Sequence, residues 1–143
     1  VEAIVGDASE LAIDRTLNAA ASGDAARAVA EFSRAVTAGE SPQGLLVALQ
    51  RHLQRLHRIR TDLDAGASFE DGIRQQRPPV HFKQKDALGL QCRMWSSPRL
   101  VQALARTSEA AKAARLTSSL EEAITEELLM MLAAAARPAA GRA

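Results

Sequence analysis

The sequence is poor in aromatic residues and in cysteine. Its 143 residues include no tyrosine, one tryptophan, three phenylalanines and one cysteine. Because Cys92 has no second cysteine to pair with, the chain cannot form an internal disulfide, and nothing in it requires an oxidising compartment. Few residues are β-branched, and no segment alternates apolar and polar residues over the length of a strand. Sheet structure is therefore not expected.

Signatures of catalysis, metal binding and membrane insertion are also missing. The eight glycines form no phosphate loop of the G-x-x-x-x-G-K-[ST] type, so ATP hydrolysis by this chain alone is not expected. No CxxC or HExxH spacing occurs, and one cysteine with three histidines offers little for a zinc site. No apolar run reaches the roughly 20 residues that span a bilayer, and no signal peptide is visible. We expect a cytoplasmic, non-catalytic chain with no cofactor and no membrane contact. Since it begins with Val1 rather than Met, we expect a fragment or a processed product.

Alanine and leucine, which favour helices, are abundant. A chain of this length forms one domain that buries roughly 68–70% of its unfolded surface. The pattern predicts an all-α fold, a single bundle of six to seven helices without a fixed-period repeat. The expected helices cover about 9–18, 25–38, 42–65, 68–74, 80–95, 98–116 and 118–136, after a turn at Gly6 and Asp7. The expected N-caps are Ser9, Asp24, Ser41, Ser68, Ser97 and one of Ser118 and Ser119.

The most informative segment is the helix predicted for residues 42–65. Ser41 is a good N-cap, and Pro42 suits the first helical position, where a missing N–H costs nothing. Behind this start, apolar residues recur every three or four positions in one stripe about six turns long. The stripe consists of Leu45, Leu46, Leu49, Leu53, Leu56, Ile59 and Leu63. It predicts the face of the helix that packs against the core.

The other side of this helix carries an arginine face, formed by Arg51, Arg55, Arg58 and Arg60. No acidic residue lies between Glu40 and Asp62, so the cations repel one another along the helix. The arginine face is either simply solvated or covered by an acidic partner. Three partners remain open: another protein, the chain's own acidic segment at 121–127, and a nucleic-acid backbone.

Other titratable residues favour structural interpretations. His52 and His57 are five residues apart, about 140° around a helix, so they do not share a face as metal ligands would. We expect both to be polar surface residues. Glu122 and Glu126 could share a face, but a di-metal carboxylate bundle also needs Glu-x-x-His pairs, which the sequence lacks. Cys92 lies on an apolar stripe with no histidine nearby in the sequence, which indicates a buried structural cysteine.

A second unusual segment follows Pro78 and Pro79, which interrupt the helix before them. It brings two ring side chains together with two lysines: His81, Phe82, Lys83 and Lys85. Single-stranded nucleic acid binds to such combinations, because bases stack on rings and phosphates pair with cations. The alternative is that Phe82 anchors the start of a helix in the core.

Several short segments follow one another in a distinctive order. They are VGDAS at 5–9, A-x-S-G-D at 20–24, GESP at 39–42 with Leu45, Leu46 and Leu49 behind it, R-x-x-x-R-L at 51–56, RPPVHFK at 77–83 and W-S-x-x-R-L at 95–100. A leucine-rich final helix completes the pattern. In order and spacing, over essentially the whole chain, it resembles the C-terminal part of the delta subunit of the bacterial DNA polymerase III clamp loader.

The resemblance implies a helical collar domain, which catalyses nothing itself and joins loader subunits into a ring. Residues 1–8 would be the tail of a preceding AAA+-like domain, 9–136 the collar or oligomerisation domain, and 137–143 a disordered tail. The implied partners are the other clamp-loader subunits. The sliding clamp would be gripped by an N-terminal domain outside this chain, and DNA is a further candidate partner during replication.

The composition of two segments indicates candidate contact surfaces. The candidate DNA or partner contacts are Arg51, Arg55, Arg58, His81, Phe82, Lys83 and Lys85. The alternative function is a stand-alone helical nucleic-acid-binding module. The formal net charge of +1 is an argument against it, because such modules normally carry a clear basic excess.

Overall fold

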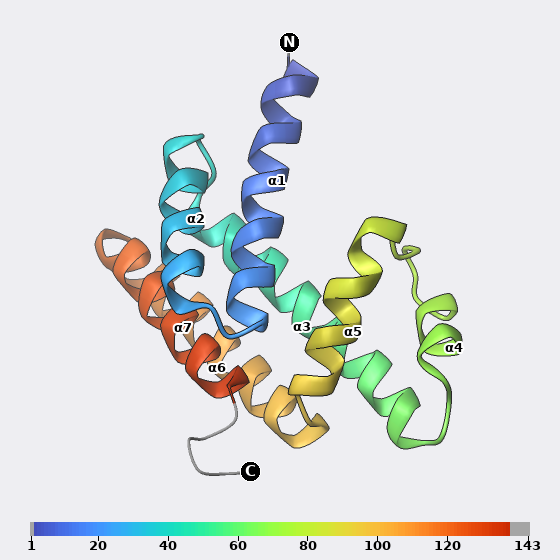
Figure 1. Cartoon of the computed structure of the whole chain (residues 1–143). Coiled ribbons are helices and arrows are strands. Elements are labelled where there is room, and N and C mark those ends of the chain that lie inside the picture. Colours follow the sequence, from blue (N-terminus) through green and yellow to red (C-terminus); the bar gives the residue numbers. More distant parts are fainter. Residues whose placement is uncertain (1, 138–143) are drawn as a thin grey trace.

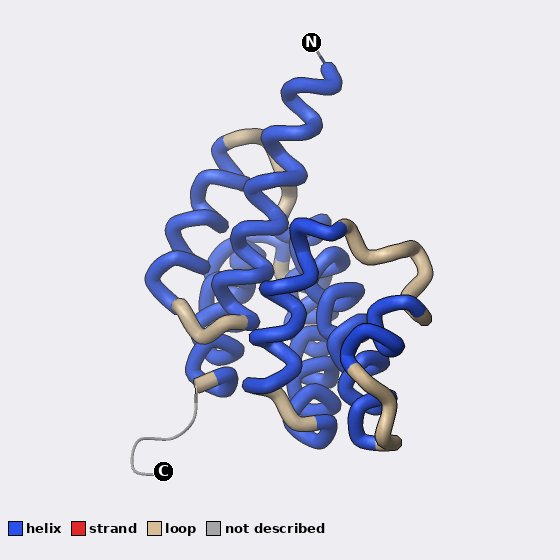
Figure 2. Tube along the Cα trace, turned by 45° about the vertical axis from the view of Figure 1, so that its right-hand side comes forward, coloured by secondary structure: helices blue, strands red, loops and turns tan. Residues whose placement is uncertain are grey.

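The computed structural model describes residues 2–137, and for residues 2–9 it describes the backbone alone. In this range the chain is an all-helical bundle without strands, as Figures 1 and 2 show, which confirms the predicted fold class. The helices are α1 (Glu2–Ala21), α2 (Ala25–Thr37), α3 (Pro42–Asp64), α4 (Phe69–Arg74), α5 (Lys85–Met94), α6 (Ser97–Leu116) and α7 (Glu121–Ala136). Two short 3₁₀ turns, η1 (Phe82–Gln84) and η2 (Ser118–Leu120), precede α5 and α7.

Helix α3 runs through the middle of the bundle, behind α1 and α5 in Figure 1, and packs most extensively against α6. It starts as predicted, because the Ser41 hydroxyl accepts the Gly44 N–H at 2.9 Å. The predicted stripe is buried from Leu45 to Ile59, and Leu63 is partly buried. The leucine pattern therefore identified the central core helix correctly.

Helices α1 and α2 form a hairpin that α7 covers. The turn between them is closed by Asp24, whose carboxylate accepts the Arg27 N–H at 3.1 Å and caps α2 as predicted. Small residues let the helices approach closely, since Ala20, Ala28 and Ala35 are fully buried. Helix α7 packs against both helices of this hairpin, and α1 also contacts α3.

The predicted start of the first helix is wrong. The helix does not begin after a turn at Gly6 and Asp7 with Ser9 as its cap, but runs without a break from Glu2 to Ala21. A single glycine costs a helix only about 1 kcal/mol, and the helix-compatible residues on both sides outweigh that cost. The first turns of α1 project beyond the neighbouring helices in Figures 1 and 2.

Two predicted caps are also wrong. Helix α6 is capped by Ser96, whose hydroxyl accepts the Arg99 N–H, and not by Ser97. Ser97 instead donates its hydroxyl hydrogen to Asp64 at 2.7 Å. Neither Ser118 nor Ser119 forms a capping box, because both lie in the 3₁₀ turn η2 before α7 begins.

The C-terminal expectation is partly wrong. Arg137 was predicted to start a disordered tail, but its Nε donates a hydrogen bond to the Gly23 carbonyl at 2.6 Å. That bond ties the end of α7 to the turn between α1 and α2. The rest of the predicted tail, residues 138–143, lies outside the described residues.

Candidate functional site

Four arginines converge on one groove of about 380 Å³ between α1, α3 and the corner that follows α4. We call it the arginine groove, after Arg51, Arg55, Arg58 and Arg77. The first three come from α3, at intervals of four and three residues, which places them along one side of the helix. Arg77 comes from the corner before Pro78. The structure thus brings together the three predicted arginines of α3 and adds a fourth, which lies 19 to 26 positions further along the chain.

Hydrogen bonds from α3 hold the corner against the groove. Arg55 Nη2 donates to the Pro78 carbonyl at 2.6 Å, and Arg58 Nε donates to Gln76 Oε1 at 3.3 Å. Gln76 is buried, and its amide in turn donates to the Gly72 carbonyl at 3.1 Å. The chain reaches α3 at this point because α4 is short and the prolines deny it a helical continuation.

The arginine groove is electrostatically unbalanced. In the part of the chain that the structure describes, no ion pair joins any of its four arginines to a carboxylate. Burial, and after it the nearby Arg58, lowers the pKa of Arg55, because both disfavour the charged form of its guanidinium. The acidic residue that lines the groove is Asp14, and burial together with Glu10 raises its pKa. The groove therefore favours an anion.

Arg60, the fourth residue of the predicted arginine face, does not line the arginine groove. It pairs with Asp64 at 2.8 Å and donates to the Cys92 carbonyl at 2.8 Å, so it braces α3 against α5. The predicted arginine face is thus divided between a structural brace and the groove. The chain's own acidic segment at 121–127 does not cover it, since among residues 10–137 no ion pair connects the two.

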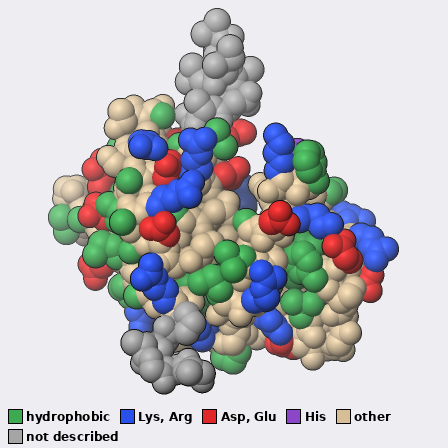
Figure 3. All heavy atoms as spheres, viewed as in Figure 1, with side chains coloured by type: hydrophobic (Ala, Val, Ile, Leu, Met, Phe, Trp, Pro, Cys, Tyr) green, Lys and Arg blue, Asp and Glu red, His purple; other side chains and the backbone are tan. Residues whose placement is uncertain are grey.

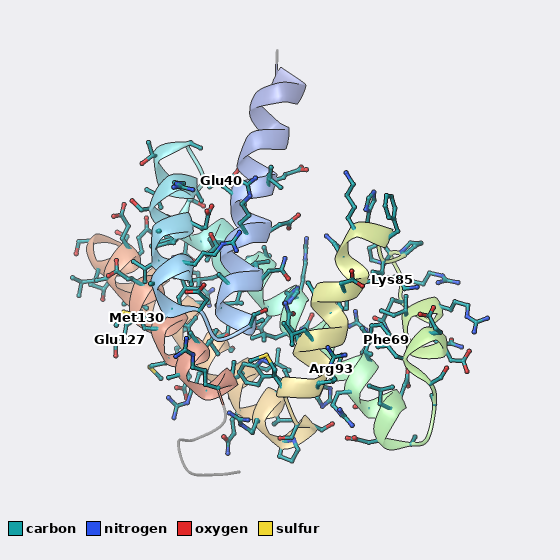
Figure 4. The ribbon with its side chains drawn as sticks, viewed as in Figure 1. Glu40, Phe69, Lys85, Arg93, Glu127 and Met130 are labelled. Atoms are coloured by element: carbon teal, nitrogen blue, oxygen red, sulfur yellow. The ribbon has the colours of Figure 1, made fainter. Side chains whose placement is uncertain are left out.

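The rings of His81 and Phe82 form an exposed stacked pair, with centroids 4.7 Å apart and planes inclined by 27°. Phe82 is 73% exposed, so the alternative prediction that it anchors a helix in the core is wrong. Instead, Phe69 of α4 packs against the core beside α5 (Figure 4). The Lys83 N–H donates to His81 Nδ1 at 3.2 Å and orients that ring.

The two candidate lysines have different surroundings. The Lys83 side chain is exposed and lines, with His81, a second hollow of about 620 Å³. This hollow shares Asp14, Asn18 and Gln84 with the arginine groove. Lys85, which is labelled in Figure 4, pairs with Glu70 at 2.9 Å and so links α5 to α4. We therefore treat Lys83 as a candidate contact and Lys85 as a support of the corner.

The sequence did not reveal a polar bridge beneath the groove. The Gln91 side-chain amide nitrogen donates to Asn18 Oδ1 at 2.8 Å, and its Oε1 lies 2.7 Å from His52 Nε2. Because the amide hydrogens are used on α1, the amide oxygen accepts, and the His52 ring donates from Nε2. Burial lowers the pKa of His52. The expectation that His52 is a surface residue is wrong, because it faces Gln91 of α5, 39 residues away.

The remaining titratable side chains singled out from the sequence are Cys92, Glu122 and Glu126. Burial raises the pKa of Cys92 to about 11, and the thiol is 2% exposed, as predicted for a structural cysteine. Glu122 and Glu126 are exposed. No group of three or more metal-ligating side chains occurs among the described residues. In the same range, no helix has both the length and the hydrophobicity to cross a membrane.

Comparisons with known proteins do not add a relative. No family model matches the chain, and neither a curated protein nor a solved structure matches it.

Proposed function

We propose that this chain is the helical collar domain of a clamp-loader delta subunit, a non-catalytic domain that holds loader subunits together while the sliding clamp is placed on DNA. One observation carries the proposal. Four of the six short segments that carry the resemblance coincide with junctions between helices, at 20–24, 39–42, 77–83 and 95–100. The other two, at 5–9 and 51–56, lie inside α1 and α3.

Three of these junctions illustrate the point. Residues 20–24 form the turn between α1 and α2, where Gly23 has a φ of 86° and Asp24 caps the next helix. Residues 39–42 form the turn into α3, with Gly39 at a φ of 102°. Residues 77–83 form the corner held by α3. A shared order of such junctions favours a shared architecture, because each one fixes the direction of the helix that follows.

Exposed apolar side chains suggest where a neighbouring subunit would bind. Leu116 is 76% exposed and Leu120 is 53% exposed, at the connection between α6 and α7; we call this pair the leucine tip. Hydrophobic side chains also show among acidic ones over α7 at the left of Figure 3, and Figure 4 labels Met130 and Glu127 there. A stable subunit interface buries on the order of 1,600 Å², so the leucine tip would be only part of it. The mechanism is scaffolding by a rigid bundle.

The test is co-purification of this chain with the other clamp-loader subunits, read by size-exclusion chromatography with light scattering. We expect a stable complex with the wild-type chain and a weaker one with the double variant Leu116→Glu and Leu120→Glu. The matched control is Thr117→Glu with Ser119→Glu, which adds the same charge at exposed polar positions of the same connection. If the wild-type chain stays alone while a longer parent assembles, this domain is not sufficient. If the parent fails as well, the family proposal is wrong.

The second candidate function is a stand-alone nucleic-acid-binding module. The exposed ring pair of His81 and Phe82 beside Lys83 favours it, because such rings offer a stacking surface for unpaired bases. Under this alternative, the isolated chain binds single-stranded DNA with a steep salt dependence, and Phe82→Ala weakens binding without lowering the salt slope. An isolated chain without measurable affinity for DNA at low salt excludes the alternative.

A further inference from the structure

We propose that the arginine groove is a binding site for phosphate groups, and that it takes the phosphodiester backbone of a nucleic-acid strand. This inference goes beyond the assembly role, because it concerns this chain alone and does not depend on membership of a clamp loader. Its basis is the convergence of Arg51, Arg55, Arg58 and Arg77 on one groove.

The groove holds many unused hydrogen-bond donors. A guanidinium group carries five N–H donors. Arg55 and Arg58 each use one, toward Pro78 and Gln76, and Arg77 uses Nη1 on the carbonyls of Arg74 and Gln76. All these acceptors are uncharged, so the four positive charges exceed the one negative charge of Asp14 in the lining of the groove. An anion of several oxygens would satisfy the remaining donors and relieve the repulsion between the cations.

The same bonds prepare the groove for a ligand. They hold the side chains of Arg55 and Arg58 between α3 and the corner, and that of Arg77 against its own corner, so that binding an anion would not require fixing three flexible side chains at once. Arg51 is exposed and makes no hydrogen bond or ion pair with the described part of the chain. It is therefore available to reach a ligand from the rim.

Two features favour a nucleic acid over an acidic protein segment. The groove, at about 380 Å³, has room for one or two phosphate groups but not for a helix about 10 Å across. Beyond Gln84, which lines both hollows, lie His81 and Lys83. A strand whose phosphates occupy the groove would thus have the His81 ring and a further cation along its path, whereas an acidic peptide would gain nothing from the ring.

The experiment uses the full chain and a fluorescein-labelled oligothymidylate, followed by fluorescence anisotropy over a range of salt concentrations. The double variant Arg55→Gln with Arg58→Gln is expected to weaken binding by roughly tenfold or more and to lower the salt slope by about two. Because these two arginines also hold the corner, Arg51→Gln is the second variant. It removes no internal hydrogen bond, and it should lower the slope by about one.

The matched control is Arg93→Gln with Arg115→Gln, which removes the same charge from exposed positions on α5 and α6 outside the groove; Arg93 is labelled in Figure 4. Equal losses in the groove and control variants would overturn the proposal, because binding would then follow net charge. Pyrophosphate serves as a competitor. If it binds in a groove-dependent way while the oligonucleotide does not, the site takes free polyphosphates and the phosphate assignment stands, but the nucleic-acid source is wrong. Groove-dependent binding of polyglutamate alone, or no binding of any of these probes, would overturn the proposal.

Discussion

The indole N–H of Trp95 donates a hydrogen bond to the carbonyl of Ala21 at 2.9 Å, and so joins the ends of α5 and α1 across 74 residues of sequence. Both residues are 2% exposed. The carbonyl of Ala21 is one of the last in its helix, where no intrahelical partner exists. Trp95 therefore fills the core and satisfies a helix end at the same time, and the guanidinium of Arg99 lies over its ring at 5.6 Å.

Replacing this residue tests the junction. Trp95→Phe keeps an aromatic ring but leaves the Ala21 carbonyl without its donor, so we expect a loss of about 1–3 kcal/mol in the free energy of unfolding. Since Trp95 is the sole tryptophan, unfolding in urea should be followed by circular dichroism. Phe32→Leu is the control, because it removes buried ring atoms without breaking a hydrogen bond. A Trp95→Phe variant as stable as the wild type would show that the bond contributes nothing.

Replacing Gly23 or Gly89 by alanine should change the stability of the chain in opposite directions. Gly23 has a φ of 86°, and a Cβ placed there would lie 2.9 Å from Arg137 Cγ, so Gly23→Ala should cost about 1–2 kcal/mol. Gly89 lies inside α5 with helical geometry, and the nearest atom to an added Cβ is Phe69 Cζ at 3.5 Å. Gly89→Ala should stabilise the chain by about 0.5–1 kcal/mol. Thermal unfolding measures both, and the same sign for the two variants would contradict this account.

Cys92 should be inert in the folded chain. Its pKa of about 11 leaves only about one thiol in a thousand ionised at pH 8, and the thiolate is the reactive species. We expect Ellman's reagent to modify Cys92 slowly under native conditions and promptly in urea. The control chain carries Cys92→Ser and Ser119→Cys, which moves the thiol to an exposed position and should react at once. Prompt native modification of Cys92 would mean that α5 opens readily.

The sequence predicted the fold well where the signal was local. The leucines of α3, the caps Asp24 and Ser41, and the proline break at Pro78 each act within a few residues, and all appear where expected. The sequence analysis missed that α1 continues through Gly6, because a glycine weakens a helix without ending it.

The candidate site was predicted only in part. Arg51, Arg55 and Arg58 stood out because they share one side of a helix. Arg77 joins them because hydrogen bonds that span 18 to 23 residues hold its corner against α3, and such bonds leave no periodic pattern in the sequence. His52 was misassigned for the same reason, since only its contact with Gln91 separates it from a surface histidine. The exposure of Phe82 could not be predicted, because the local sequence does not distinguish an exposed ring from a buried one.

His52 should make the chain less stable as the pH falls. Burial lowers its pKa below the ordinary value of 6.5, so the unfolded chain takes up a proton before the folded chain does. The free energy of unfolding is therefore highest above pH 6.5 and declines as the pH falls through that value, by at most about 1.4 kcal/mol per pH unit. Asp14 acts in the opposite sense at lower pH, because its raised pKa makes the folded chain the better proton acceptor.

A comparison of variants separates the contribution of His52 to the pH dependence of stability from the contribution of the carboxylates. His52→Gln keeps a side-chain N–H for Gln91 but removes the titrating ring, so its stability should change less between pH 7 and pH 5, while His57→Gln should follow the wild type. Urea unfolding at several pH values measures the difference. If His52→Gln and the wild type lose the same stability between pH 7 and pH 5, then protonation of His52 does not cause that loss. In that case the bridge from α3 through Gln91 to Asn18 tolerates a charged ring.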